Sequence, residues 1–368
     1  MRATLRVKVG GKVAKLQLFI KRLPTANKPK ADFIDKSNFF RKEVLAYKLL
    51  GETVPDSDPA PYYSKVFIHT DTMVVMPDLA AAGYASRNHL EALDLPHARL
   101  AVKSIARFHA AYTNYETMKA IKSNRPYSLY EDHADLLNEP TFCDSPWLRA
   151  CSKLTVNFLN AFSTKFNRNI PHLESKLDKL NLEACESLKE VPGTLNTLIH
   201  KDFWMNNILF KYEGDVPANA LLIDFQCVRY GPPTFDLMLF LYLTTTRSFR
   251  EHHEREVFQE YYRIFNENLD KDSKARLSAI GYDEAEFLSW CERSRMFGLF
   301  EALSIFPFVL MDPVTAQRHF DDPDTYELLM NVDRTGPVLD HAGQSTEYRV
   351  RQLEVCEEFI ERYVLPSV

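Results

Sequence analysis

The sequence predicts an α+β protein with two lobes, a small antiparallel-sheet lobe at residues 1–79 and a larger helical lobe at residues 80–368. The short apolar or alternating runs that are typical of strands gather in the first lobe. The pattern becomes mainly helical after Gly83. One further pair of short apolar runs, near residues 208 and 222, lies within the helical part and predicts a β-hairpin.

The first 22 residues predict a β-hairpin of their own. Apolar residues from Leu5 to Val9 alternate with polar ones, Gly10-Gly11 supplies a tight turn, and a second alternating run ends at Lys21. Residues 1–31 hold nine basic residues and no acidic one, a composition that is also found in mitochondrial transit peptides. Because a transit peptide is an amphipathic helix, the period of two favours the hairpin.

A lysine and a glutamate of the first lobe are predicted to pair. Phe19 and Lys21 share one face of the second strand, which therefore offers an aromatic ring and an ammonium group. The next periodic segment, residues 37–50, is helical, and Glu43 lies within its apolar stripe. A buried carboxylate without a partner costs on the order of several kcal/mol, so we expect Lys21 to reach it. The alternative is that Glu43 lies partly exposed at the edge of the stripe.

The connection between the lobes is predicted at Met76-Pro77-Asp78-Leu79, directly after two short strands near residues 66–68 and 73–76. A long helix then begins after Asp94, which is a good cap residue. His109 lies on this helix, where a packed and hydrogen-bonded histidine is favoured over a ligand.

The central hairpin places polar residues side by side. Its strands are expected at Ile208-Leu209-Phe210 and Leu221-Leu222-Ile223, with turn formers between them. Because an antiparallel pair returns the chain to its starting level, Asn207 and Asp224 become neighbours, and their oxygens suit Mg²⁺. Asp202 lies in the loop before them, where a carboxylate can orient a hydroxyl and accept its proton.

The spacing of these residues is that of phosphoryl-transfer enzymes. His-x-Asp-x-x-x-x-Asn followed by a strand and then Asp-Phe is the signature of the kinase fold. The alternative is a chance hairpin with an Asp and an Asn at its mouth. The kinase interpretation implies ATP, with Phe19 over the adenine, Lys21 at the α- and β-phosphates, and the segment from Met76 through Asp78 to Leu79 at the adenine edge.

One aspartate follows the signature closely. Asp236 comes twelve positions after Asp224, a distance too short for the activation segment of a protein kinase. We expect Asp236 to cap the helix that it begins and to accept backbone N–H groups of the loop around Asp202.

The composition of the chain indicates which classes of binding partner are unsuited to it. The chain has 368 residues, 45% of them hydrophobic and 26% charged, and a net charge of −5 without a dense basic run. This argues against nucleic acid or an anionic membrane as the main partner. The six cysteines show no metal-ligand spacing, and no apolar run reaches the length of a membrane span. We therefore expect a cytoplasmic protein that acts on a small molecule, without an obligate protein partner.

Taken together, these residues resemble the CHK kinase-like, or ecdysteroid kinase-like, family, which is related to choline and aminoglycoside kinases. The resemblance implies a protein-kinase-like fold that phosphorylates a hydroxyl of a small molecule with ATP. It implies that Asp202 is the catalytic base, that Asn207 and Asp224 bind Mg²⁺, and that Lys21 holds the phosphates with Glu43 as its orienter. The matching segments are Leu18 to Lys21, Phe39 to Tyr47, Met76 to Leu79 with Gly83-Tyr84, Ile105 to Ala110, His200 to Phe210, Ile223 to Gln226 and Phe235 to Leu237.

The chain departs from the family pattern at three places. Lys201 stands where relatives often have Gly, and Pro77 stands where they often have Glu. Relatives also have a first strand and a phosphate loop before the strand that begins here near Ala3. We expect either that the sequence is truncated at its start or that ATP binding is weakened, because the β- and γ-phosphates lose backbone N–H donors.

Because of these departures, alternatives to an active small-molecule kinase remain. The main alternative to a kinase is a catalytically impaired relative that binds an apolar ligand or a protein. A protein kinase is disfavoured by the short segment to Asp236 and by Gln226, which stands where protein kinases have Gly. The acceptor alternatives are an ecdysteroid, a choline-like cation and a xenobiotic alcohol or phenol.

Overall fold

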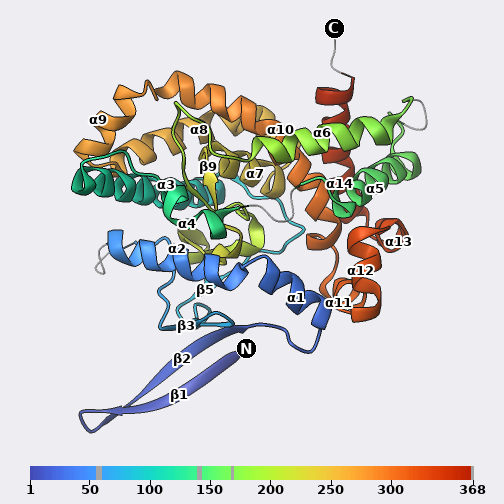
Figure 1. Ribbon diagram of the computed structural model, residues 1–368. Helices are drawn as coiled ribbons and strands as arrows, with labels where there is room; N and C mark the ends of the chain where they lie inside the picture. Colours follow the sequence, from blue (N-terminus) through green and yellow to red (C-terminus); the bar gives the residue numbers. More distant parts are fainter. Residues whose placement is uncertain (55–59, 139–142, 167–169, 366–368) are drawn as a thin grey trace.

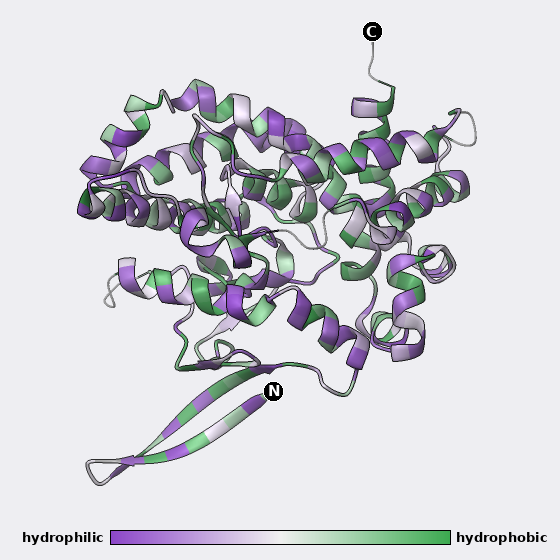
Figure 2. Cartoon of the chain, viewed as in Figure 1, coloured by the Kyte–Doolittle hydropathy of each residue, from purple (hydrophilic) through white to green (hydrophobic). Residues whose placement is uncertain are grey.

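The computed structural model describes residues 1–54, 60–138, 143–166 and 170–365. The first part of the chain forms a four-stranded antiparallel sheet. Its strands, in spatial order, are β1 (Arg2–Val9), β2 (Lys12–Arg22), β4 (Met73–Pro77) and β3 (Ile68–Thr70). The predicted N-terminal hairpin is confirmed: β1 pairs with β2 around a turn in which both glycines have positive φ, as a two-residue hairpin turn requires. This hairpin extends away from the other elements, and its residues alternate in hydropathy (Figures 1 and 2).

Two helices follow β2, namely α1 (Lys28–Lys36) and α2 (Phe39–Thr53). The apolar stripe of α2 is buried, and Glu43 lies within it. In Figure 1, α2 lies between the sheet and the helical part of the molecule. Glu43 is therefore carried at the place where the two parts of the chain meet.

The central hairpin is longer than predicted. Its strands are β7 (Ile208–Glu213) and β8 (Val216–Leu222), which turn at Gly214-Asp215, and β5 (Tyr84–Ala85) adds a third strand. Polar residues that we had placed in the connection pair across the strands instead, because one face of this hairpin is solvated. A second small sheet, β6 (Thr197–Ile199) with β9 (Arg229–Gly231), was not predicted.

The C-terminal part is helical, as expected, and is built around the helix α7 (Thr234–Thr244). All residues of α7 are buried, and α7 packs against α10 (Glu284–Val309), where Gly298 allows a close approach: a Cβ there would lie 2.8 Å from the carbonyl of Met238. The long helix capped by Asp94 is confirmed as α3. The elements are α3 (Leu95–Ser123), α4 (Leu129–Leu137), α5 (Pro146–Phe162), α6 (Leu173–Ser187), η1 (Met205–Asn207), η2 (Phe225–Cys227), α7 (Thr234–Thr244), α8 (Arg247–Asn268), α9 (Lys271–Ala279), α10 (Glu284–Val309), α11 (Pro313–Phe320), α12 (Pro323–Asn331), α13 (Thr335–Gln344), α14 (Thr346–Phe359) and the π-helical turn η3 (Ile360–Val364).

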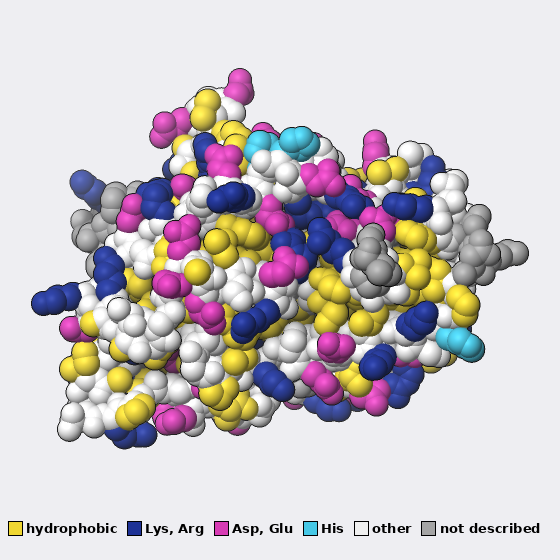
Figure 3. Space-filling view, turned by 90° about the horizontal axis from the view of Figure 1, so that it is seen from above, with side chains coloured by type: hydrophobic (Ala, Val, Ile, Leu, Met, Phe, Trp, Pro, Cys, Tyr) yellow, Lys and Arg dark blue, Asp and Glu magenta, His cyan; other side chains and the backbone are white. Residues whose placement is uncertain are grey.

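Charged side chains are distributed over the outside of the helical part. Figure 3 shows acidic and basic groups intermixed over one face. Within the described ranges, no single helix combines the length and the apolar composition needed to cross a membrane. Helices α10 and α11 meet both conditions only as a pair, and they are bent by 95° at the break between them.

Candidate active site

Lys21 lies at the centre of a cluster that joins three elements. It stands on β2, and its Nζ donates to Glu43 Oε2 of α2 at 2.9 Å, to Asp224 Oδ1 at 2.6 Å and to Gln226 Oε1 of η2 at 2.9 Å. The strand and the helix come from the beginning of the chain, whereas Asp224 and Gln226 follow the central hairpin. The predicted pair of Lys21 with Glu43 is confirmed.

Glu43 is the deeply buried member of this cluster. Its side chain is 1% exposed, so the alternative of an exposed position at the edge of the stripe is wrong. Burial raises the pKa of Glu43 above its ordinary value, and the Lys21 ammonium opposes that rise. Burial alone would lower the pKa of Lys21, but Asp224 and Glu43 outweigh it and raise that pKa. Lys21 is thus the counter-charge that a buried carboxylate requires.

The mouth of the central hairpin brings together the predicted loop residues. Asn207 Nδ2 donates to both the backbone oxygen and Oδ2 of Asp202, each at 2.8 Å. Ile223 N donates to Asn207 O at 3.0 Å, which holds the two hairpin ends together. Asp224 follows with φ of 64°, a left-handed conformation that turns the chain out of the strand. Asn207 and Asp224 therefore leave adjacent strand ends, as the antiparallel pairing predicted.

Asp202 has an environment that suits proton transfer. Burial, together with the nearby Asp224 carboxylate, raises the pKa of Asp202, while His200, Lys201 and the hydrogen bond from Asn207 act in the opposite sense. A carboxylate whose pKa is raised is a stronger base than an exposed aspartate.

Asp236 forms hydrogen bonds with the backbone of the loop that carries Asp202. The carboxylate of Asp236 accepts from the backbone N–H of His200 at 2.6 Å and of Lys201 at 2.7 Å, as predicted. His109 Nε2 lies 2.9 Å from the same carboxylate, and Tyr261 OH lies 2.7 Å from His109 Nδ1, so the packed, hydrogen-bonded interpretation of His109 is confirmed. The expected capping role is wrong: α7 has no side-chain cap, because this carboxylate faces the loop instead.

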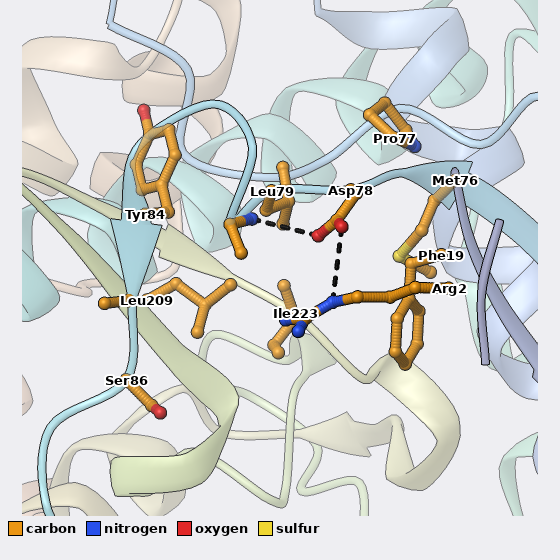
Figure 4. Close-up of a pocket in the computed structure, with 12 residues that line it drawn as sticks. Arg2, Phe19, Met76, Pro77, Asp78, Leu79, Tyr84, Ser86, Leu209 and Ile223 are labelled. Atoms are coloured by element: carbon orange, nitrogen blue, oxygen red, sulfur yellow. Dashed lines mark hydrogen bonds and ion pairs between the residues drawn. The ribbon is translucent and has the colours of Figure 1, made fainter. Parts of the chain in front are cut away.

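A pocket of about 350 Å³ opens beside this cluster, at the connection between the sheet and the helical part. Phe19, Met76 and Asp78 line it, together with Leu209 and Ile223 of the hairpin (Figure 4). Phe19 precedes Lys21 by two residues on the same strand face, and Ile223 precedes Asp224. The pocket is therefore adjacent to the Lys21 cluster and is mainly apolar in its lining.

One polar feature of the pocket was not predicted. Arg2 Nε lies 3.2 Å from Asp78 Oδ2, and Figure 4 shows the arginine side chain extending across the pocket below Asp78. The other oxygen of Asp78 accepts from the backbone N–H of Ala80 at 3.2 Å. Position in the sequence gave no signal for Arg2, because its partner is 76 residues away and is brought near only by the pairing of β1, β2 and β4.

In the segment that connects the sheet to the helical part, one backbone N–H group of the described residues is available to a ligand. Pro77 has no N–H, Asp78 N donates to Gln17 O, and the N–H groups of residues 80–84 bond within the segment. Within the described part of the chain, the N–H of Leu79 is the one in residues 77–84 for which no hydrogen bond is formed. Leu79 is one of the residues that line the pocket, and an N–H without an internal acceptor is suited to an acceptor atom of a ligand.

The residues at the hairpin mouth fit a divalent metal ion. Because Asn207 Nδ2 is committed to Asp202, its Oδ1 is the atom that remains for a cation, and the Asp224 side chain is 28% exposed. Among the residues that the structure describes, no three His, Cys, Asp or Glu side chains gather as a metal site. A two-ligand set suits Mg²⁺, which usually keeps several waters and binds substrate phosphates in addition to one or two carboxylates.

Gln226 was missed as a site residue. In the sequence, Gln226 was only the last residue of a segment that matches the family, and it stood where protein kinases have Gly. Its place two residues after Asp224, in a turn of 3₁₀ helix, puts its amide oxygen against Lys21. Nothing in the sequence predicted a turn at this point, so the contact of Gln226 with Lys21 could not be predicted.

These features together define the protein-kinase-like fold. A small antiparallel sheet carries a lysine that pairs with a glutamate of a helix. The helical part carries a loop with an Asp and an Asn, and an Asp-Phe pair follows its hairpin. Comparison with known proteins agrees with this class. The chain belongs to the ecdysteroid kinase-like family, to which residues 1–273 match. It is thus a member of a kinase-like phosphotransferase family.

Individual relatives are distant. The uncharacterized kinase-like protein D1044.1 of Caenorhabditis elegans is 23% identical over 169 residues, which are 46% of this chain and 40% of that protein. The match thus spans less than half of that relative. Among solved structures, amicoumacin kinase hAmiN in complex with AMP-PNP, Ca²⁺ and Ami is 12% identical, with 96% of this chain and 88% of that chain covered and a TM-score of 0.49. An ethanolamine kinase of Plasmodium vivax is 12% identical, with 95% and 81% covered and a TM-score of 0.45.

Proposed function

We propose that this chain is an ATP-dependent phosphotransferase that transfers phosphate to a hydroxyl of a small molecule. The observation that carries the proposal is the Lys21 cluster, in which one ammonium contacts both a buried glutamate and Asp224. A lysine that only stabilised the fold would need one carboxylate, whereas a lysine and an aspartate that meet at a hairpin mouth beside a pocket suit the binding of a metal-bound polyphosphate.

Each residue has a role in the proposed reaction. Asp202 orients the acceptor hydroxyl and takes its proton, and Asn207 fixes the Asp202 side chain through the 2.8 Å hydrogen bond to Oδ2. Asn207 Oδ1 and Asp224 hold Mg²⁺, which supplies charge neutralisation for the phosphates. Lys21 contacts the α- and β-phosphates, and Glu43 keeps the ammonium in place. Positioning and electrostatic stabilisation account for the catalysis, because phosphoryl transfer needs little covalent participation by the protein.

The proposed nucleotide lies in the pocket at the connection. The adenine is placed against Phe19, Met76 and Asp78, where the N–H of Leu79 donates to a ring nitrogen. In this proposal the chain divides at residue 79 into an N-terminal lobe that covers the nucleotide and a C-terminal lobe, residues 80–368, that carries the catalytic loop.

The proposed acceptor is an apolar alcohol, either an ecdysteroid or a xenobiotic compound. The family to which the chain belongs supports this class, since its description is ecdysteroid kinase-like. The proposal includes a cytoplasmic location. Three buried cysteines, Cys151, Cys291 and Cys356, are free thiols, which is usual for a reducing compartment.

Titration calorimetry with Mg·ATP tests the proposal on the unaltered chain and on Asp224→Ala. We expect measurable binding by the unaltered chain and a loss of at least roughly tenfold in the variant, because a charged metal ligand is removed. Asp215→Asn, at the exposed hairpin turn, is the control and keeps full affinity. Radiolabelled phosphate transfer to hydroxylated steroids and to phenols then identifies the acceptor. Absence of Mg·ATP binding by the unaltered chain would contradict the kinase and favour the impaired ligand-binding alternative.

A further inference from the structure

The three protons of the Lys21 ammonium all have protein acceptors. An ammonium group has three hydrogens and no lone pair, and here they are directed to Glu43, Asp224 and Gln226 at 2.9, 2.6 and 2.9 Å. A phosphate oxygen that comes to Lys21 must therefore replace one of these three acceptors. The energetic difference between the acceptors decides which one is replaced.

Glu43 is the acceptor that cannot be released cheaply. Its side chain is 1% exposed, and its Oε1 has no hydrogen-bond partner among the described residues. Loss of Lys21 would leave a buried carboxylate without a counter-charge, which is strongly destabilising. Asp224 is also charged, and its contact with Lys21 is the shortest of the three.

Gln226 is the one neutral acceptor. A hydrogen bond from an ammonium to an amide oxygen is weaker than the charge-paired bonds to two carboxylates, so it is the first to be exchanged. A third carboxylate at this position would give one lysine three negative neighbours. An amide completes the coordination of the ammonium without adding charge that would repel a polyphosphate.

Building on the proposed function, we propose that Gln226 is a phosphate-binding residue. A phosphate oxygen of the nucleotide takes the place of Gln226 Oε1 at Lys21, and the amide group of Gln226 then donates an N–H from Nε2 to that phosphate. Glutamine is suited to both states, because its side chain carries an acceptor and two donors on one planar group. Glutamate has the same shape but has no donor when it is ionised.

The test compares Mg·ATP with adenosine, which carries the base but no phosphate. Binding of both ligands is measured by titration calorimetry on the unaltered chain, on Gln226→Glu and on Gln226→Leu. We expect Mg·ATP affinity to fall roughly ten- to a hundredfold in Gln226→Glu, which loses the donor and gains a charge, and roughly tenfold or less in Gln226→Leu. Adenosine affinity stays the same in all three chains, because the pocket at the connection does not include Gln226.

A matched control and the thermal midpoint separate this role from a structural one. Gln259→Glu makes the same change at an exposed position of α8 and leaves Mg·ATP affinity unaltered. Equal Mg·ATP affinity of Gln226→Glu and the unaltered chain would overturn the inference while the proposed function stands. A parallel loss of adenosine affinity or of thermal stability would also overturn it, because it would indicate a disturbed fold. Absence of Mg·ATP binding by the unaltered chain would contradict the proposed function itself.

Discussion

Replacing Asp236 with asparagine should detach the loop that carries Asp202. Asp236 is fully buried, and its two carboxylate oxygens divide the donors between them: Oδ2 accepts from His200 N and faces His109 Nε2, whereas Oδ1 accepts from Lys201 N. Asparagine has the same shape but only one acceptor oxygen. In either orientation, its NH₂ group meets at least one buried donor.

The magnitude follows from these contacts. If the amide oxygen takes the place of Oδ2, the hydrogen bond at 2.7 Å from Lys201 N is lost and its N–H is left buried against another donor. Loss of a hydrogen bond to a charged group, together with an unsatisfied buried donor, destabilises by about 2–4 kcal/mol. The opposite orientation loses two donors and is worse. The proposed transferase activity should fall with the stability, because Lys201 is the neighbour of Asp202.

Urea unfolding followed by circular dichroism measures this effect. Asp236→Asn should lower the unfolding midpoint, whereas Asp215→Asn, which removes the same charge from an exposed turn, should change the free energy of unfolding by less than about 0.5 kcal/mol. Equal midpoints for the unaltered chain and Asp236→Asn would refute the argument that this carboxylate holds the loop.

Two further predictions concern the fold. Burial raises the pKa of Glu116 to about 7 from an ordinary value of 4.5. The unfolded chain therefore loses this proton first as the pH rises, and the stability that is present below pH 4.5 declines up to pH 7. Glu116→Gln should lack this decline, so that its stability relative to the unaltered chain rises by about 3 kcal/mol across that range, measured by urea unfolding at several pH values. Gly298→Ala should lower the thermal midpoint by an amount that corresponds to about 1–3 kcal/mol, because its Cβ would lie 2.8 Å from the carbonyl of Met238, whereas Gly343→Ala, where the Cβ meets no atom within 4 Å, should have little effect.

Local patterns in the sequence were sufficient to predict several parts of this site. The alternation of apolar and polar residues around Gly10-Gly11 predicted the N-terminal hairpin. The position of Glu43 inside an apolar stripe predicted its pairing with Lys21, because burial of an unpaired charge is costly. Antiparallel pairing gave the proximity of Asn207 and Asp224. In each case one physical rule, applied to neighbouring residues, left few alternatives.

The contacts that were missed depend on the packing of distant elements. Gln226 reaches Lys21 across 205 positions of sequence, and Arg2 reaches Asp78 through three paired strands. The pairing of β6 with β9 escaped prediction because the central hairpin separates the two short strands in sequence, so no turn signal links them. The capping role of Asp236 was wrong for a related reason. A local rule assigned its carboxylate to the helix as well as to the loop, but the two loop N–H groups and His109 of α3 occupy both of its oxygens.

Phe225, the phenylalanine after Asp224, packs between the elements that carry the Lys21 cluster. Its ring packs edge to face against Tyr47 of α2 at 5.0 Å, stacks on Phe108 of α3 at 5.2 Å, and contacts the His200 ring at 5.0 Å. Phe225 therefore fixes the helix that carries Glu43 to the loop that carries Asp202. The left-handed φ of Asp224 places its carboxylate at Lys21 while the next residue enters this aromatic stack. A polar residue at position 225 would keep the charges but would lose the packing that brings them together.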